Sequence, residues 1–191
     1  MKHLIIYAHP SQQSLNHSIK QSLVNELSVN HEVKVRDLYQ LEFNPVLSEQ
    51  DLQGQRNGQV DPLIQTEQQW ITWAECITFI YPTWWAGMPA ILKGYIDRVF
   101  SYGFAYRYVQ GEQQGLLTNK QVVIINTQGK SMAEYEESGM AQAISMTIDR
   151  GIMEYCGLTL SDHIYLDRAD RADAEQLLHW NLEISERFGL K

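Results

Sequence analysis

The chain has 191 residues, 44% of them hydrophobic and 20% charged, which excludes a wholly disordered, collagen-like or coiled-coil protein. Its 15 basic and 23 acidic side chains give a formal net charge of −8, so we expect no nucleic-acid partner, because such binding draws on positive charge. No apolar run approaches the roughly 20 residues that span a bilayer, and no export signal is visible, so we expect a single cytoplasmic domain, residues 1–191, without membrane insertion.

The first part of the chain contains two strand signals and one helix signal. Residues 4–8 form a continuous apolar run, typical of a central strand, and apolar residues then recur every four positions over residues 15–27, which predicts an amphipathic helix. Residues 33–36 alternate between valine and basic side chains, which predicts a strand nearer an edge of the sheet. Residues 38–60 are interrupted by asparagine, proline and glycine, so we expect a long loop there with at most a short helix.

The rest of the chain alternates between helices and strands. In chain order, the patterns predict helices over 62–74, 89–100, 140–156 and 172–188, and strands over 76–81, 121–127 and 158–166. Strands separated by helices pair in parallel, with right-handed crossovers and helices on both faces of the sheet. We therefore predict an α/β fold with a five-stranded doubly wound parallel sheet.

Cysteine and histidine, which often mark redox or metal sites, give no such signal here. Cys76 and Cys156 stand apart in the sequence, so neither a zinc knuckle nor a redox CxxC motif exists, and we expect both to be small buried residues. The 6 histidines have no carboxylate or cysteine at ligand spacing, so we expect no metal site.

In doubly wound sheets, ligands bind beyond the carboxyl ends of the strands, which points to three loops. The first loop, residues 9–16, leads into a helix N-terminus, where free N–H groups favour an anion such as phosphate. It lacks the glycine patterns of dinucleotide and nucleotide-triphosphate loops, so side chains such as His9, Ser14 and Asn16 must supply the donors. The alternative is that Ser14 only caps the helix and His9 is a surface residue.

The second loop, residues 81–89, contains the adjacent tryptophans Trp84 and Trp85. Neighbouring loop residues point in different directions, so we expect at least one ring to line a cleft and to stack on a planar heterocycle, although both rings could be core residues. Gly87 would let the backbone approach that ring closely. The third loop, residues 126–130, adds amide and hydroxyl donors. Together the loops offer what a flavin requires along its length.

Several motifs carry a family resemblance. Residues 81–100 read YPTWWAGMPAILKGYIDRVF and residues 103–108 read GFAYRY. With AHP at 8–10, SLN at 14–16 and TEQ at 66–68, they resemble the DT-diaphorase-like NAD(P)H:quinone oxidoreductases, which have a flavodoxin-like fold. The resemblance implies a homodimer with a flavin in each interface site. It also implies ping-pong transfer of two electrons as hydride, from NAD(P)H through the flavin to a quinone.

The same resemblance implies roles for individual residues. Contacts to the flavin phosphates, and through Gln68 to the pyrophosphate or adenosine side, are expected from His9, Ser14, Leu15, Asn16 and Gln68. Contacts along the isoalloxazine ring, with Trp85 stacking, are expected from Pro82, Thr83, Trp84, Trp85, Ala86, Asn126, Thr127, Gln128 and Gly129. The candidate catalytic residues are Trp85, Tyr106, Tyr108 and Tyr135. Of these, Tyr106 and Tyr108 would come from the second subunit.

The chain also departs from the family pattern. The family often has Thr-Thr-Gly-Gly where residues 126–129 read Asn-Thr-Gln-Gly, so we expect altered contacts to the ring. Tyr135 is offset by one from a family tyrosine, and no histidine lies near Met140, so a Tyr/His proton relay is not carried over. The segment 38–60 and Gln68 resemble the FAD-binding branch of the family, which favours FAD, with FMN as the alternative. A second reading is a flavin-binding ancillary subunit of a potassium efflux system, and a third is an electron-carrier flavodoxin.

Overall fold

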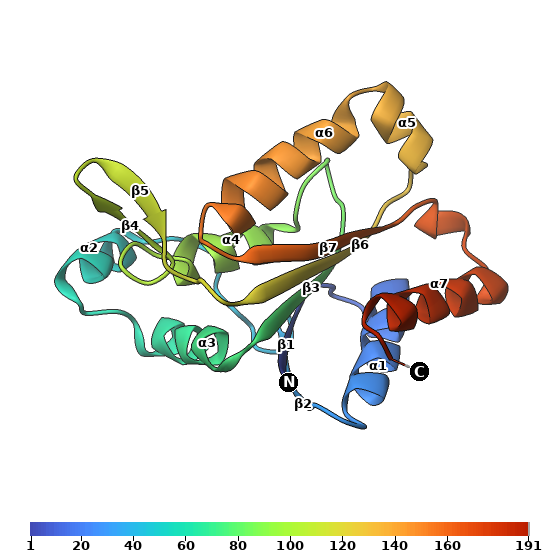
Figure 1. The fold of residues 1–191 in the computed structure, drawn as a ribbon, viewed down its shortest axis with the longest axis horizontal. Helices are drawn as coiled ribbons and strands as arrows, with labels where there is room; N and C mark the ends of the chain where they lie inside the picture. The colour runs from blue at the N-terminus through green and yellow to red at the C-terminus, as the bar shows by residue number, and fades with distance from the viewer. Residues whose placement is uncertain (191) are drawn as a thin grey trace.

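The computed structural model describes residues 1–190 and contains a five-stranded parallel sheet with helices on both faces (Figure 1). Its strands are β1 (Lys2–Tyr7), β2 (Glu32–Asp37), β3 (Cys76–Pro82), β6 (Gln121–Thr127) and β7 (Thr159–Leu166). Their order across the sheet is β2-β1-β3-β6-β7, and all four pairings are parallel. The predicted doubly wound sheet is confirmed, because each strand coincides with a predicted segment.

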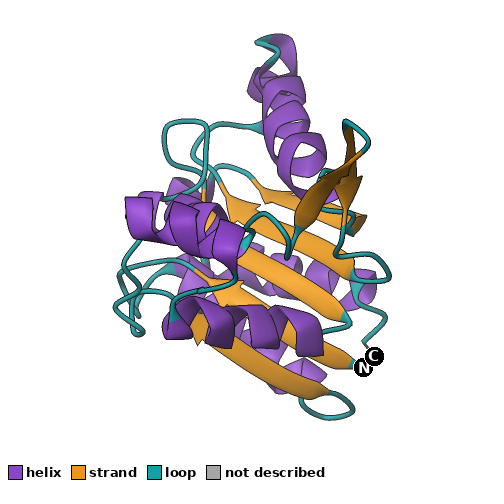
Figure 2. Ribbon diagram, turned by 90° about the vertical axis from the view of Figure 1, so that its left-hand side faces the viewer, coloured by secondary structure: helices purple, strands orange, loops and turns teal. Residues whose placement is uncertain are grey.

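Two helical layers enclose the sheet (Figure 2). One layer consists of α1 (Leu15–Leu27) and α7 (Ala174–Arg187), which pack side by side. The other contains α3 (Pro62–Trp73), α4 (Ala90–Val99), and α6 (Met140–Ile144) continued by the π-helix η1 (Ser145–Glu154). Short helices α5 (Met132–Glu137) and η2 (Ala169–Arg171) follow β6 and β7. None of the helices within residues 1–190 is long and apolar enough to cross a membrane.

The core has two halves because side chains of a strand alternate between the faces of the sheet. Leu4 and Ile6 of β1 belong to the half beneath α3 and α4, whereas Ile5 and Tyr7 belong to the half beneath α1 and α7. Cys76 and Cys156 are buried and free, as predicted. Burial raises the pKa of the Cys76 thiol to about 11 and that of Cys156 to about 12, so both stay protonated at neutral pH.

A β-hairpin, β4 (Tyr106–Val109) with β5 (Glu112–Gly115), was not among the predicted elements. Its two-residue turn places Gln110 and Gly111 at φ 54° and 88°, which is the geometry that antiparallel hairpins favour. Gln at the first turn position is a weak sequence signal, and the strand EQQG has no apolar alternation. At Gly115 the hairpin backbone packs directly against the backbone of Gly157. An added Cβ at Gly115 would lie 2.3 Å from the Gly157 nitrogen, so a larger residue would not fit there.

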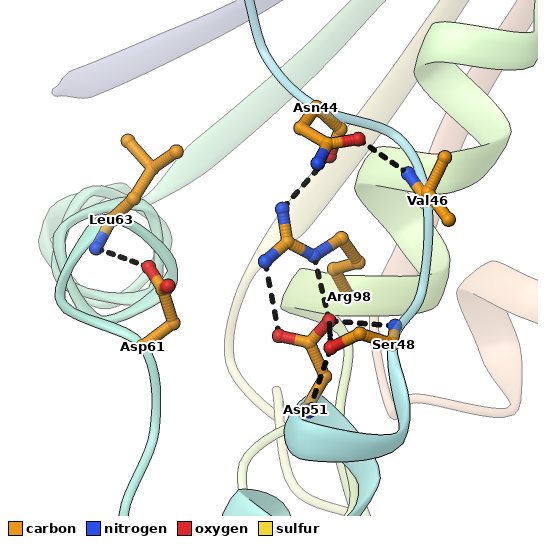
Figure 3. Close-up of polar contacts among 7 residues, drawn as sticks. All are labelled: Asn44, Val46, Ser48, Asp51, Asp61, Leu63 and Arg98. Atoms are coloured by element: carbon orange, nitrogen blue, oxygen red, sulfur yellow. Dashed lines mark hydrogen bonds and ion pairs between the residues drawn. The ribbon is translucent and has the colours of Figure 1, made fainter.

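The long segment over residues 38–60 is fastened to α4 (Figure 3). It contains one short helix, α2 (Glu49–Asn57), in agreement with the prediction. The Arg98 guanidinium donates to both carboxylate oxygens of Asp51, at 3.0 and 3.1 Å, and to the Asn44 carbonyl at 2.8 Å. At Gly94 an added Cβ would lie 2.2 Å from the Pro45 carbonyl oxygen, so the segment lies directly on the α4 backbone.

Candidate functional site

The three loops meet at the carboxyl ends of β1, β3 and β6, where direct hydrogen bonds join them. The Asn16 side-chain amide donates to the Thr127 hydroxyl at 2.9 Å and is buried. The Asn126 side-chain amide donates to the Thr83 hydroxyl at 2.5 Å. The backbone N–H of Thr83 donates to the Thr127 carbonyl at 2.7 Å. These hydrogen bonds join the three loops into one rim at this edge of the sheet.

The first loop is shaped by its own polar side chains. Ser14 caps α1, since its hydroxyl accepts from the His17 N–H at 3.1 Å and donates to the Ser11 carbonyl at 2.8 Å. The His9 ring accepts from the Ser11 N–H at 3.0 Å and lies 5.9 Å from the Trp84 ring. Ser14 is thus a cap, as the alternative reading held, and it also stands where α1 presents its positive dipole end.

The second loop folds as a tight turn in which Trp84 and Gly87 exchange two backbone hydrogen bonds of 3.0 Å. Its two central residues, Trp85 and Ala86, have φ of 51° and 58°. This left-handed conformation is uncommon for residues other than glycine, and it is found disproportionately at ligand-binding sites. The turn leaves the Trp85 ring fully exposed, with a relative accessibility of 103%. The sequence analysis did not predict these two left-handed residues, which directly precede Gly87.

The third loop is anchored to the end of β7. The Gln128 N–H donates to the Leu166 carbonyl, and the Gln128 carbonyl accepts from the Ala169 N–H. The Gln128 side chain is buried, and its Oε1, like Oδ1 of Asn16, finds no hydrogen-bond partner among residues 1–190. A buried acceptor without a partner is costly, so these two atoms are destabilising features of the rim.

Four of the predicted site residues lie outside these three loops within one chain. Gln68 donates its side-chain amide to the Val99 carbonyl at 3.1 Å and to the Ser101 hydroxyl at 3.0 Å. Tyr106 and Tyr108 lie on the hairpin, at the opposite end of the sheet from α5 (Figure 1). Tyr135 lies in α5, which follows the third loop, and is half-buried.

The structure also reveals a polar cluster that the sequence analysis missed. The His163 ring contacts Asn126 Oδ1 through Nε2 at 2.8 Å and Asp149 Oδ1 through Nδ1 at 2.7 Å. The Tyr165 hydroxyl lies 3.0 Å from the same Nδ1, and the Tyr165 and His163 rings stack at 4.0 Å. Two polar residues alternating on β7 were a weak signal, but nothing in the sequence joined them to Asp149.

Comparison with known proteins assigns the chain to a family. A family model described as a flavodoxin-like fold matches residues 1–187. A protein of Haemophilus influenzae named as an uncharacterized NAD(P)H oxidoreductase is 44% identical over 161 residues, 83% of this chain and 79% of that protein. The chain belongs to the flavodoxin-like oxidoreductases. The resemblance found in the sequence is thereby confirmed at the level of the family.

This oxidoreductase is also similar to a rat enzyme and to a solved bacterial structure. NAD(P)H dehydrogenase [quinone] 1 of Rattus norvegicus is 33% identical over 175 residues, covering 81% of this chain and 64% of the rat protein. The chain thus spans less than two thirds of that relative. A crystal structure of a candidate quinone reductase from Klebsiella pneumoniae superposes with a TM-score of 0.92 at 29% identity, covering 99% of this chain and 84% of that one.

Proposed function

We propose that this oxidoreductase is a flavin-dependent NAD(P)H:quinone oxidoreductase. The observation that carries the proposal is the turn at Trp85, which holds an indole ring fully exposed beside a rim of fixed amides and hydroxyls. A flat aromatic face next to hydrogen-bonding groups suits a planar heterocycle. The names of the rat and Haemophilus influenzae relatives support the same reaction class.

The residues present fit a flavin at both ends. Ser14 and the N-terminus of α1 suit the phosphates, because free N–H groups and the helix dipole favour negative charge. At the other end the rim offers the Thr83 hydroxyl, a group that can both donate and accept hydrogen bonds. The pyrimidine edge of a flavin carries both donors and acceptors and therefore requires such a mixture.

A bound flavin would supply the ability to accept hydride from NAD(P)H and deliver it to a quinone. The chain supplies the rest. Trp85 provides a flat face that orients the planar reactants, and His9 with Ser14 fixes the phosphate end. Thr83 and the Asn126 loop place hydrogen bonds at the ring edge, where preorganised donors stabilise negative charge as it develops. Because nicotinamide and quinone both need the same flat face, they bind in turn.

We favour FAD over FMN as the cofactor. A cavity of about 520 Å³ lies between α1 and the end of β2, lined by His17, Lys20, Asp37 and their neighbours. It adjoins the first loop, because Asp37 is paired with the last residue of β1, Tyr7. Such a cavity gives room for the adenosine half that distinguishes FAD from FMN. Acid release of the flavin and chromatography against both standards would decide between them.

The purified protein is expected to be yellow. Under anaerobic conditions NADH or NADPH should bleach it, because the flavin is reduced, and the quinone menadione should restore the colour. The measurement is the absorbance of the flavin through one such cycle, followed by steady-state turnover. A colourless protein that neither flavin reconstitutes would contradict the proposal, and flavin binding without turnover would favour the ancillary-subunit reading.

A homodimer would bring the hairpin into the proposed site. Tyr102, Tyr108 and Val109 are 42%, 53% and 45% exposed, which makes the hairpin region unusually apolar for a free surface. The substitutions Tyr106→Ala and Tyr108→Ala together are expected to weaken association and to raise the quinone KM, because aromatic residues commonly anchor interfaces. Sedimentation velocity and steady-state kinetics would measure the two effects.

Arg107→Ala provides the matched control for this prediction. Arg107 lies between the two tyrosines on β4, so its side chain points to the other face of the hairpin, where it contacts Gln114. It should leave both association and KM unchanged. A wild-type protein that is monomeric and fully active at assay concentration would show that each chain closes its own site.

A further inference from the structure

A buried row of polar side chains runs from a surface cleft to the second loop. Asp149 contacts His163, His163 contacts Asn126, and Asn126 donates to Thr83, at 2.7, 2.8 and 2.5 Å. The four residues come from η1, β7, β6 and the loop after β3. The cleft, of about 350 Å³, is lined by Asp149, His163 and Tyr165 among others. The row therefore links solvent to the rim of the proposed flavin site.

Burial makes the direction of each hydrogen bond in this row consequential. The side chains of His163 and Asp149 are 6% and 8% exposed, and Asn126 is buried. Buried polar groups in a low-dielectric environment must have matched donors and acceptors, since water does not replace a lost partner. If one residue in the row changes its protonation state, the neighbouring residue therefore has to exchange its hydrogen-bond donor for an acceptor, or the reverse.

The partners of the His163 ring in this arrangement match a ring that carries an N–H on both nitrogens. The Asn126 amide nitrogen donates to Thr83, so its oxygen faces Nε2 of His163 and requires an N–H there. The other ring nitrogen, Nδ1, faces the Asp149 carboxylate and requires a second N–H. Only the imidazolium form carries an N–H on both nitrogens. The Thr83 oxygen accepts from Asn126, which leaves its hydroxyl hydrogen free for another acceptor.

A neutral His163 would reverse the direction of the hydrogen bonds that join His163, Asn126 and Thr83. Its single N–H would remain on the side of Asp149, so Nε2 would become an acceptor. The Asn126 amide would then have to turn over and donate to Nε2, which brings its oxygen to Thr83. The Thr83 hydroxyl would have to donate to that oxygen and would no longer be free. The charge on His163 thus sets the direction of the Thr83 hydroxyl.

We propose that His163 is a positioning residue that controls, through Asn126, whether Thr83 can donate a hydrogen bond to the ring edge of a bound flavin. This inference rests on the proposed flavin site. Protonated His163 leaves the Thr83 hydroxyl free to donate, which stabilises the negative charge that gathers at the pyrimidine edge on reduction. Neutral His163 withdraws that donor. The departure from the Thr-Thr-Gly-Gly pattern at Asn126 places a side-chain amide at the position that connects His163 with Thr83.

The groups around His163 leave Asp149 as its charged partner. Tyr165, on the same strand, and Tyr81, on β3, face the cluster, and burial above all raises the pKa of each hydroxyl, so both stay neutral. Glu136 of α5 and Arg150 of η1 line the same cleft with opposite charges. Asp149 is the charged side chain in this row that contacts the His163 ring directly, at 2.7 Å.

The first test is nuclear magnetic resonance on the whole chain without flavin. The ring nitrogens of His163 and the side-chain amide of Asn126 are followed against pH, and both are expected to trace one titration curve. In Asp149→Asn the shared curve should move to lower pH, because the carboxylate no longer favours the charged ring. The exposed His179 provides a control, since His179→Gln should leave the curve in place. An Asn126 amide that does not respond while His163 titrates would overturn the inference.

The second test uses the flavin-loaded protein and measures the midpoint potential of the flavin as a function of pH. An inflection is expected at the pH of the shared curve. It should be lost in His163→Gln and in Thr83→Val, whereas His163 should still titrate in Thr83→Val. An inflection that survives Thr83→Val would show that His163 acts on the flavin by another route. If the protein binds no flavin, the proposed function fails, and the first test still decides whether His163 reverses Asn126.

Discussion

Trp85→Ala is expected to abolish most turnover while the protein unfolds at nearly the same urea concentration as the wild type. The Trp85 side chain is fully exposed within the chain, so truncation exposes no buried apolar surface. A ring face of about 100 Å² that covers a planar ligand contributes about 2.5 kcal/mol at about 25 cal/mol per Å². That corresponds to a loss of roughly 70-fold in kcat/KM if the contact persists in the transition state.

Phe100→Ala is the matched comparison, because it truncates an aromatic residue from the same sequence motif that belongs to the core. Phe100 is 6% exposed and lies 6.4 Å from Phe79, between ring centres. This substitution is expected to cost about 3 to 5 kcal/mol of the free energy of unfolding, with kcat/KM of the folded fraction unchanged. Urea denaturation and kinetics of both variants test the pair. If Trp85→Ala lowers stability and spares activity, Trp85 is a structural residue.

The sheet could be predicted from the sequence because its signals are continuous. Apolar runs such as residues 76–81 suit a strand that is covered on both faces of the sheet. The hairpin was missed because most of its strand residues are polar or exposed and their stability depends on contacts such as Gly115 against Gly157. Glycine pairs that lie 42 residues apart leave no local pattern.

The rim of the site was predictable for a different reason. The rule that ligands bind beyond the carboxyl ends of parallel strands selects loops, and Asn16, Thr83 and Thr127 then meet because those loops are neighbours. The His163 cluster follows no such rule. Asp149 and His163 meet because η1 packs over β7. This packing depends on the tertiary structure, so the sequence pattern of neither element indicates it.

The second large expected effect is a loss of stability on substitution of Arg98. This residue belongs to the motif that carries the family resemblance, but its contacts lie within the fold and outside the candidate site. Its guanidinium and the Asp51 carboxylate are 8% and 7% exposed, and they form two hydrogen bonds of 3.0 and 3.1 Å. Removing one member of a buried ion pair leaves the other charge without a partner. Arg98→Met is therefore expected to lower the free energy of unfolding by about 3 to 5 kcal/mol. The exposed pair of Lys93 and Asp97 serves as the control, and Lys93→Met should cost at most about 0.5 kcal/mol.

The pH dependence of this effect has a defined sign. Burial alone would raise the pKa of Asp51, but hydrogen bonds from Arg98 and Ser48 outweigh it and hold the pKa below its usual value. A lowered pKa in the folded state adds stability above the ordinary carboxyl pKa of about 3.9, and this stability disappears as the pH falls through the lowered value. The wild-type protein should thus lose its advantage over Asp51→Asn below about pH 4.

Urea denaturation at pH 7 and at several acidic values measures this difference. The double variant Arg98→Met with Asp51→Leu distinguishes two causes of the lost stability, the unpaired charge of Asp51 and the loss of the other contacts of Arg98. Because the double substitution leaves no buried charge, it should recover much of the stability lost in Arg98→Met alone. A double variant as unstable as the single one would show that Arg98 acts through its other contacts, the Asn44 carbonyl and the Phe43 ring. Those contacts would then be what fastens residues 38–60 to α4.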